Sequence, residues 1–349
     1  MRAKVALSYD DVLLLPQYSD IRSRKEVNVG TTLGWHDERK IHLGLPVISS
    51  PMDTVTGPLM AECMNRFGGV GIIHRYCTID EQTDMVRLTK ENRFKTESGV
   101  QVGAAVGVTG DYVNRAVLLR YAGADFICVD VAHGHHILMK EAIEKIRDAC
   151  GTGCHIMAGN VATLDGVDAL AKWGADSVRC NIGGGSICST RIQTGHGVPG
   201  LETIMECAKT VHGVSIIADG GLRNSGDIVK ALAAGADCVM IGSLLAGTAE
   251  SPGDFVYVNG DKRKTYRGMA SKEAQKDWRG TTSSLEGIST TIPYKGYVAD
   301  VLSQLDNGIR SGFSYSGART LREMQIKSRF VRQTASGISE SGTHILGRS

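Results

Sequence analysis

The sequence predicts an α/β protein with a (β/α)8 (TIM) barrel, built as a single domain over residues 1–349. Eight short apolar, β-branched runs recur along the chain, at residues 46–50, 69–73, 102–106, 126–130, 155–158, 177–180, 215–218 and 238–241. Such runs, alternating with helical segments, are typical of a parallel sheet covered on both faces. Gly-Ala-Asp precedes three runs, at residues 123–125, 174–176 and 235–237, where a left-handed glycine can end a helix. Eight units favour a closed barrel over an open doubly wound sheet.

Three stretches lie outside this repeat. Residues 1–45 are polar and include a segment at 9–15 that we expect to plug or cover one end of the barrel. Residues 250–300 have weak periodicity, and a loop of this length after the last strand is more often functional than idle. We therefore expect an active-site flap at about residues 266–296. From about residue 320 the sequence predicts a last helix followed by a polar, mobile end.

The composition is that of an ordinary globular protein, with 42% hydrophobic residues and a formal net charge of +2. This charge argues against nucleic acid as the main partner. Nine cysteines, several within apolar runs, indicate free thiols in a reducing, cytoplasmic setting. We find no signal peptide and no apolar run long enough to span a membrane, so no membrane partner is expected.

A glycine-rich stretch with one cysteine follows the sixth predicted strand, where a barrel carries its chemistry. Three glycines at 183–185 let backbone groups approach a ligand or ion, and Ser186 offers a hydroxyl to a phosphate. Cys188 lies near Arg191 in a polar setting that favours the thiolate and predicts a nucleophile. The alternative is a flexible turn with an incidental cysteine.

Glycine turns also follow the last two predicted strands, at Asp219-Gly220-Gly221 and Gly242-Ser243. In barrels these two loops commonly bind phosphate through backbone N–H groups and a helix N-terminus. Asp219 is too acidic to face a phosphate, so a ribose diol is its expected partner. The alternative is a glycine turn with a capping aspartate.

Other strand ends and the flap contain candidate metal ligands, cofactor contacts and a candidate general acid/base. The histidines at 133, 135 and 136, and Cys150 with Cys154, fit no metal-ligand spacing. Residues 130–134 are either a dinucleotide contact or a polar rim, and no Rossmann fingerprint is present. A nicotinamide cofactor would therefore lie across the barrel mouth. Glu286 is a candidate general acid/base acting through Thr190, or else a surface glutamate.

Residues 183–191, together with 50–55, 219–221, 242–243 and 266–269, resemble the IMP dehydrogenase/GMP reductase family over nearly the whole chain. The resemblance implies a barrel, a homotetramer, a purine 5′-nucleotide at the seventh and eighth strands, and a covalent bond from Cys188 to purine C2. It also implies a monovalent cation, usually potassium, on the backbone of Gly183, Gly185 and Cys188. The regulatory CBS modules of many dehydrogenases would fall near residues 80–100, where there is no room for them.

The resemblance assigns roles residue by residue. The implied catalytic residues are Cys188, Thr190 and Glu286. The implied substrate-binding residues are Ser50, Met52, Ser186, Asp219, Gly220, Gly221, Gly242, Ser243, Tyr266, Gly268, Met269, Ala270 and Gly287. The implied cofactor-binding residues are Ser23, Arg24, Asp130, Val131, Ala132, Asn160, Ile182, Gly183, Tyr315 and Gly317.

The sequence resembles the two activities of this family in different places. Residues 50–56, 68–74 and 336–341 are more like dehydrogenases. Residues 268–271 and 286–290 are more like reductase flaps. Residues 23–27 and 130–132 are also more like the corresponding segments of reductases. The Arg-Tyr pair with which dehydrogenases activate water is missing between residues 269 and 286, where Trp278-Arg279 is the nearest equivalent.

The resemblance therefore favours an NADPH-dependent GMP reductase, with an NAD-dependent IMP dehydrogenase as the alternative. It implies that the Cys188 thiolate adds to C2 of GMP and that Thr190 with Glu286 protonates the departing amine. Hydride from NADPH then yields IMP. A non-catalytic nucleotide-binding protein and a deoxy or base-modified substrate are further alternatives. Two positions depart from the family, because Gly184 stands where proline is usual and Asn181 where glycine is usual.

Overall fold

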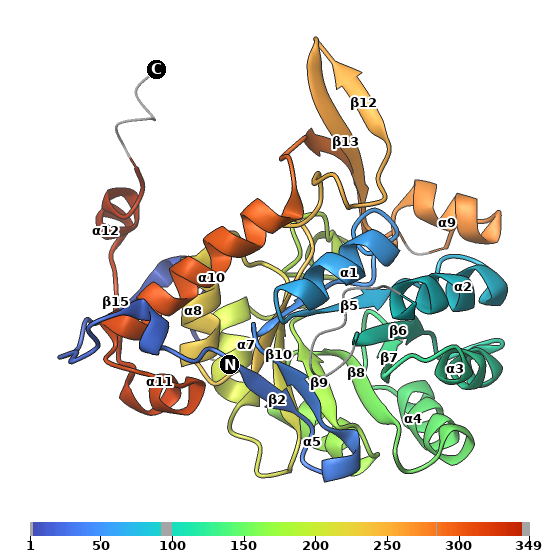
Figure 1. The fold of residues 1–349 in the computed structure, drawn as a ribbon, viewed down its shortest axis with the longest axis horizontal. Helices are drawn as coiled ribbons and strands as arrows, with labels where there is room; N and C mark the ends of the chain where they lie inside the picture. The colour runs from blue at the N-terminus through green and yellow to red at the C-terminus, as the bar shows by residue number, and fades with distance from the viewer. Residues whose placement is uncertain (1–2, 92–99, 284, 344–349) are drawn as a thin grey trace.

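The computed structural model describes residues 3–91, 100–283 and 285–343, and it forms the predicted closed barrel (Figure 1). Eight parallel strands follow one another around the barrel in chain order. They are β4 (Val47–Ser49), β5 (Val70–Ile73), β6 (Val102–Val106), β7 (Phe126–Asp130), β8 (His155–Val161), β9 (Ser177–Cys180), β10 (Ser215–Asp219) and β11 (Cys238–Ile241). Each predicted apolar run forms one of these strands, which confirms the predicted fold class.

Helices cover the outside of the barrel between successive strands (Figure 1). They are α1 (Pro58–Arg66), α2 (Ile79–Lys90), α3 (Tyr112–Tyr121), α4 (Ile137–Cys150), α5 (Leu164–Lys172), α7 (Gly200–Cys207), α8 (Ser225–Ala233) and α10 (Val298–Tyr315). Each buries one face; in α8, Ile228, Val229 and Leu232 are at most 4% exposed. Their spacing of one, three and four residues places them on one side of the helix, which packs toward the barrel.

The three Gly-Ala-Asp tripeptides join neighbouring strands at their amino-terminal ends. Each glycine has a positive φ of 104° to 113°, as expected for a residue that ends a helix. Each aspartate then accepts a hydrogen bond from a backbone N–H near the start of the preceding strand: Asp125 from Val102, Asp176 from Ile156 and Asp237 from Ile216, at 2.7 to 2.9 Å. The repeated motif therefore fixes the register at one end of the barrel.

A short hairpin of β2 (Thr31–Leu33) and β3 (Ile41–Leu43) lies at that same end, with η3 (Asp37–Arg39) in its turn. Leu33, Ile41 and Leu43 are buried in the cluster that fills the barrel interior. The carbonyl of Arg39 lies 2.7 Å from Nδ1 of His155, the first residue of β8. The hairpin thus closes the amino-terminal end and leaves the carboxyl ends of the strands open.

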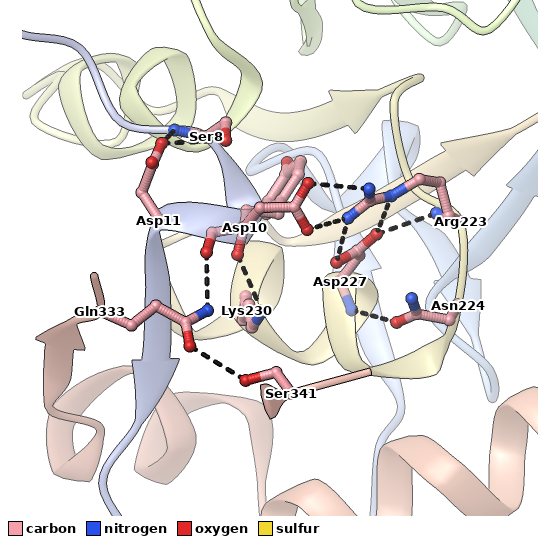
Figure 2. Close-up of polar contacts among 10 residues, drawn as sticks. Ser8, Asp10, Asp11, Arg223, Asn224, Asp227, Lys230, Gln333 and Ser341 are labelled. Atoms are coloured by element: carbon pink, nitrogen blue, oxygen red, sulfur yellow. Dashed lines mark hydrogen bonds and ion pairs between the residues drawn. The ribbon is translucent and has the colours of Figure 1, made fainter. Parts of the chain in front are cut away.

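A segment near the start of the chain meets a segment near its end beside α8. Strand β1 (Val12–Leu14), after η1 (Tyr9–Asp11), pairs antiparallel with β15 (Phe330–Arg332). Figure 2 shows Arg223 between Asp10 and Asp227, and the Gln333 amide donating to the Asp10 carbonyl at 2.6 Å. The predicted last helix is present as α11 (Leu321–Lys327), but β15 and α12 (Ala335–Glu340) follow it. These two short elements were not predicted, because a three-residue strand is too short to show a periodic pattern, and the mobility of the polar end stays a prediction.

A three-stranded antiparallel sheet follows the last barrel strand where the sequence predicted a loop. It consists of β12 (Phe255–Val258), β13 (Asp261–Arg267) and β14 (Ser289–Pro293), with α9 (Lys272–Arg279) between the last two. Its first hairpin projects from the barrel (Figure 1) and turns at Asn259 and Gly260, with φ of 53° and 86°. An Asn-Gly pair between two β-prone runs is a strong hairpin feature, so the sequence did contain this information.

Some predictions fall on residues outside the described ranges. These are residues 92–99 of the stretch where a CBS insertion would lie, Ser284 of the flap, and the last residues from 344 onward. Within the ranges that are described, no helix is long and apolar enough to cross a membrane.

Candidate active site

A cavity of about 470 Å³ opens at the carboxyl ends of the barrel strands. This volume is within the range of about 300 to 1,000 Å³ that is usual for ligand pockets. Most residues singled out from the sequence line it: Ser50, Met52, Asp130, Val131, Ala132, Asn160, Ile182, Gly183, Gly185, Ser186, Cys188, Thr190, Asp219, Gly220, Gly221, Gly242, Ser243, Tyr266, Gly268, Met269, Ala270, Glu286 and Gly287. Ser23, Arg24, Tyr315 and Gly317 are not among its lining residues.

Cys188 lies in a tight turn after β9. Its backbone N–H donates to the Gly185 carbonyl at 3.1 Å, and the short helix α6 (Thr190–Thr194) begins two residues later. The Cys188 thiol lies 3.2 Å from Thr190 Oγ1, and the Thr190 hydroxyl donates to Glu286 Oε2 at 2.7 Å. The turn thus connects a half-buried thiol through a hydroxyl to a carboxylate.

Backbone pairing holds Glu286 beside the cysteine turn. The N–H of Ser189 donates to the Glu286 carbonyl at 2.9 Å, and the N–H of Ile288 donates to the Ile187 carbonyl at 3.0 Å. Gly268, after β13, donates to the Ile288 carbonyl at 3.0 Å. Because these bonds join main-chain atoms, the position of Glu286 does not depend on its own side chain.

A buried arginine crosses the floor of the cavity. Arg179, on β9, forms ion pairs with Asp130 at 2.5 Å and Asp219 at 2.7 Å, and its side chain is only 7% exposed. Burial opposes the charge of Arg179, but the two carboxylates raise its pKa well above the usual value. Asn160 also donates to Asp219, at 2.8 Å. Sequence analysis missed Arg179, although a charged residue within an apolar strand run is itself unusual.

The opposite wall combines small residues with hydroxyl groups. A side chain on Gly242 would come within 2.8 Å of Ser50 Oγ and 3.2 Å of Met52 Sδ, so glycine keeps this corner open. Ser50 Oγ is buried without a hydrogen-bond partner among the described residues, and it lines the cavity. The Tyr266 hydroxyl lies 3.4 Å from Ser186 Oγ, and burial raises its pKa, so it remains protonated. These groups are suited to binding a polar ligand.

Comparison with known proteins identifies the family. Residues 6–344 match the family model described as IMP dehydrogenase / GMP reductase domain. The chain belongs to this family. It is 36% identical to the inosine-5′-monophosphate dehydrogenase of Nitrosopumilus maritimus, over 99% of both chains. It is 33% identical to the GMP reductase of Leishmania donovani, over 98% of this chain and 97% of that one.

A solved structure is similar over the whole fold. A cysteine-to-alanine variant of GMP reductase from Trypanosoma brucei, in complex with guanosine 5′-monophosphate, is 33% identical and has a TM-score of 0.92, over 98% of both chains. Family members are oxidoreductases that act on purine nucleotides. The alignments to the two relatives above extend over 476 and 482 positions, so both relatives contain segments that this 349-residue chain lacks.

Four residues on and beside the flap helix also line the cavity, and three of them were not predicted from the sequence. Trp278 packs edge-on against Tyr76, with ring centroids 6.2 Å apart, and the Arg115 guanidinium lies 5.6 Å from the Trp278 ring. These contacts attach α9 to the barrel. Gln275 and Arg279 on α9 line the cavity, together with Arg75 and Tyr76 after β5. Only Trp278-Arg279 had been noted in the sequence, as the nearest equivalent of an Arg-Tyr pair.

Four residues implied by the family resemblance lie in a separate place. Ser23 caps η2 (Arg24–Glu26), and the Tyr315 carbonyl accepts from Gln17 at the end of α10. A side chain on Gly317 would meet the Tyr18 carbonyl. These residues therefore lie where the N-terminal segment crosses the end of α10. Among the residues described, no three His, Cys, Asp or Glu side chains form a group that could hold a metal ion.

Proposed function

We propose that this protein is a GMP reductase that converts GMP to IMP and ammonia with NADPH. The observation that carries the proposal is the series of contacts from the Cys188 thiol through Thr190 Oγ1 to Glu286 Oε2, at 3.2 and 2.7 Å. The flap supplies this glutamate but contains no Arg-Tyr pair between residues 269 and 286. The site therefore has a route for protons at the cysteine without the water-activating pair of the dehydrogenases.

The proposed reaction begins when the Cys188 thiolate adds to C2 of the guanine ring. The C2–N bond then breaks, and Thr190, in contact with Glu286, protonates the departing amine so that ammonia leaves. A thioimidate between Cys188 and C2 remains. Hydride addition at C2 is followed by cleavage of the C–S bond, which releases IMP and regenerates the thiolate. GMP, NADPH and two protons give IMP, ammonium and NADP⁺.

The cavity walls are suited to holding the nucleotide during these steps. We propose that Ser186, Gly221, Gly242 and Ser243 bind the 5′-phosphate and that Asp219 binds the ribose. All four are small, and two are glycines, so their backbone N–H groups can approach an anion. Binding energy from the phosphate and ribose would then hold C2 near the Cys188 thiolate.

NADPH supplies the hydride. We propose that Asp130, Val131, Ala132, Asn160 and Ile182 hold its nicotinamide end, because they line the cavity beside the cysteine turn. Ser23, Arg24, Tyr315 and Gly317 lie outside this cavity, and we propose that these residues of a neighbouring copy contact the adenosine end. A homotetramer, which the family resemblance implies, would provide such a neighbour.

A monovalent cation, potassium in our proposal, fits the chemistry of the cysteine turn. Gly183, Gly185 and Cys188 offer neutral carbonyl oxygens, the type of ligand that alkali cations prefer. The turn already brings the Cys188 N–H to the Gly185 carbonyl. A bound cation would help to order the turn. All nine cysteines are free thiols, which suits a reducing cytoplasmic compartment.

One observation favours IMP dehydrogenase as the second candidate. Arg279, on the flap helix, lines the same cavity as Glu286, and an arginine there could activate a water molecule. A paired assay separates the two. We expect reduced-nicotinamide absorbance to fall when the protein is mixed with NADPH and GMP, and to stay unchanged with NAD and IMP. Turnover only in the second mixture would overturn the reductase proposal.

A further inference from the structure

Two departures from the usual family sequence meet at one point in the structure. Asn181, just after β9, is 5% exposed and has a φ of 146°, in a region that favours glycine. A Cβ on Gly184 would lie 2.1 Å from Asn181 Nδ2 and 2.7 Å from its Cγ. The amide of Asn181 therefore occupies the space that any side chain at position 184 would need.

The Asn181 side chain also joins three segments around the cysteine turn. Its Nδ2 donates to the Gly220 carbonyl at 3.3 Å, in the loop after β10. Its Oδ1 accepts from Arg191 Nη2 at 3.4 Å, in α6. Gly184, within the cysteine turn, is the third segment's contact with the Asn181 side chain. The amide thus fills the space between the cysteine turn, the proposed phosphate loop and α6.

This arrangement affects how Cys188 is presented. Gly184 directly precedes Gly185, whose carbonyl closes the turn by accepting the Cys188 N–H at 3.1 Å. A displaced Gly184 would shift this turn and the thiol with it. A proline at position 184, as is usual in the family, would place its own Cβ in the space that the Asn181 amide fills here. With asparagine at 181, position 184 therefore has room only for glycine.

We propose that Asn181 is a positioning residue for Cys188, coupled to Gly184, and that its amide supports the cysteine turn. The amide packs against the turn and ties it to Gly220, which offsets the unfavourable backbone conformation of Asn181. This inference rests on the proposed function only in taking Cys188 as the nucleophile, and it holds for reductase and dehydrogenase alike.

A double-mutant cycle tests the coupling without requiring any turnover. The four proteins are the wild type, Asn181→Gly, Gly184→Ala and the double variant. The first readout is the rate at which iodoacetamide alkylates Cys188, followed by mass spectrometry of its peptide across a pH range. The second is kcat and KM with whichever substrate pair is active. The alkylation readout distinguishes a failed inference from a failed choice of reaction.

We expect Gly184→Ala alone to change Cys188 alkylation and lower kcat by roughly tenfold or more, because the new methyl group overlaps the Asn181 amide. Asn181→Gly alone should lower kcat by about threefold to tenfold, because the cysteine turn loses its contact with the Asn181 amide. In the Asn181→Gly background, Gly184→Ala should have almost no further effect. That rescue would not be expected if Asn181 contributed only to general stability.

Two variants serve as matched controls. Gly153→Ala adds a methyl group to a glycine with no atom within 4 Å of the new Cβ. Asn259→Gly relaxes another asparagine with positive φ, in the projecting hairpin. Both should leave Cys188 alkylation unchanged. If the effects of Asn181→Gly and Gly184→Ala simply multiply in the double variant, the coupling is absent and the inference is wrong.

Discussion

The hydroxyl of Thr190 donates a 2.7 Å hydrogen bond to Glu286 Oε2, linking the helix after the cysteine turn to the flap. A hydroxyl has one proton, so while Thr190 donates to Glu286 it can only accept from the Cys188 thiol, 3.2 Å away. The contacts therefore have a direction, from thiol to hydroxyl to carboxylate. A proton can leave Cys188 along this path, and one can return along it to a departing amine.

Breaking this path at either of its last two positions should slow the chemical step. Glu286→Gln keeps the shape but removes the base, and Thr190→Val keeps the shape but removes the hydroxyl. We expect each to lower kcat for GMP reduction by about 10² to 10⁴-fold, the usual contribution of general acid–base catalysis, with little change in KM for GMP. Steady-state NADPH oxidation measures both parameters.

Cys188→Ala provides the reference for that experiment. It should abolish turnover while GMP still binds, as followed by calorimetry. The combined Thr190→Val/Glu286→Gln variant should be little slower than either single variant, because both changes interrupt one path. Full activity in Thr190→Val would contradict a proton path through this hydroxyl.

Arg179 should be essential to the folded site because it neutralises two carboxylates. Arg179→Met leaves Asp219 without its ion pair and Asp130 with only the longer pair to Arg75, at 3.9 Å. Breaking a buried ion pair typically costs about 3 to 5 kcal/mol. We expect a corresponding loss in the free energy of unfolding, measured by urea denaturation, and weaker GMP binding. Arg87→Met, which removes a solvent-exposed pair with Asp84 on α2, should cost less than about 1 kcal/mol. Equal losses in both variants would contradict this account of Arg179.

The barrel strands and the catalytic motif could be predicted from short stretches of sequence, whereas an ion pair between residues far apart in the chain could not. Each buried strand is a short apolar run, so all eight barrel strands could be located. The projecting hairpin was missed although β12 is a run of four β-prone residues, because it lies outside the βα repeat and the charged strand β13 shows no apolar run. Cys188, Thr190 and Glu286 were identified from residue type and motif. Arg179 was not, because its partner Asp130 lies 49 residues earlier and Asp219 lies 40 residues later.

Arg279 should separate the two candidate reactions. In GMP reduction C2 receives hydride and no water is activated. Arg279→Ala should therefore keep kcat within about threefold of the wild-type value. In an IMP dehydrogenase the same change should slow hydrolysis, and a nucleotide adduct on Cys188 would accumulate. Mass spectrometry of the protein during turnover detects this adduct. Lys276→Ala, an exposed change on the same helix, is the control, and an adduct specific to Arg279→Ala would contradict the reductase proposal.

Asp237 should make the stability of the barrel depend on pH. Asp125 and Asp176, at equivalent positions, pair with Lys90 and Arg147 at 2.7 and 2.8 Å. Asp237 has no ion pair within the described part of the chain, and burial raises its pKa from 3.8 to about 6, against the lowering effect of the hydrogen bond from Ile216. Folding therefore favours the protonated form, so its stabilising contribution is complete below about pH 4 and is lost as pH rises through about 6.

Asp237→Asn tests this directly, because asparagine keeps an oxygen to accept the Ile216 N–H but carries no charge. A shift of about two pKa units corresponds to about 3 kcal/mol, so the variant should exceed the wild type in free energy of unfolding by up to about that amount at pH 8. The difference should disappear near pH 4, where the wild-type carboxyl is already neutral. Urea denaturation at both pH values measures it. Asp125→Asn, which loses its pairing with Lys90, should instead destabilise the protein at pH 8. If Asp237→Asn destabilised the barrel equally at both pH values, the carboxylate would be supporting the strand register and the proposed cost of its charge would be wrong.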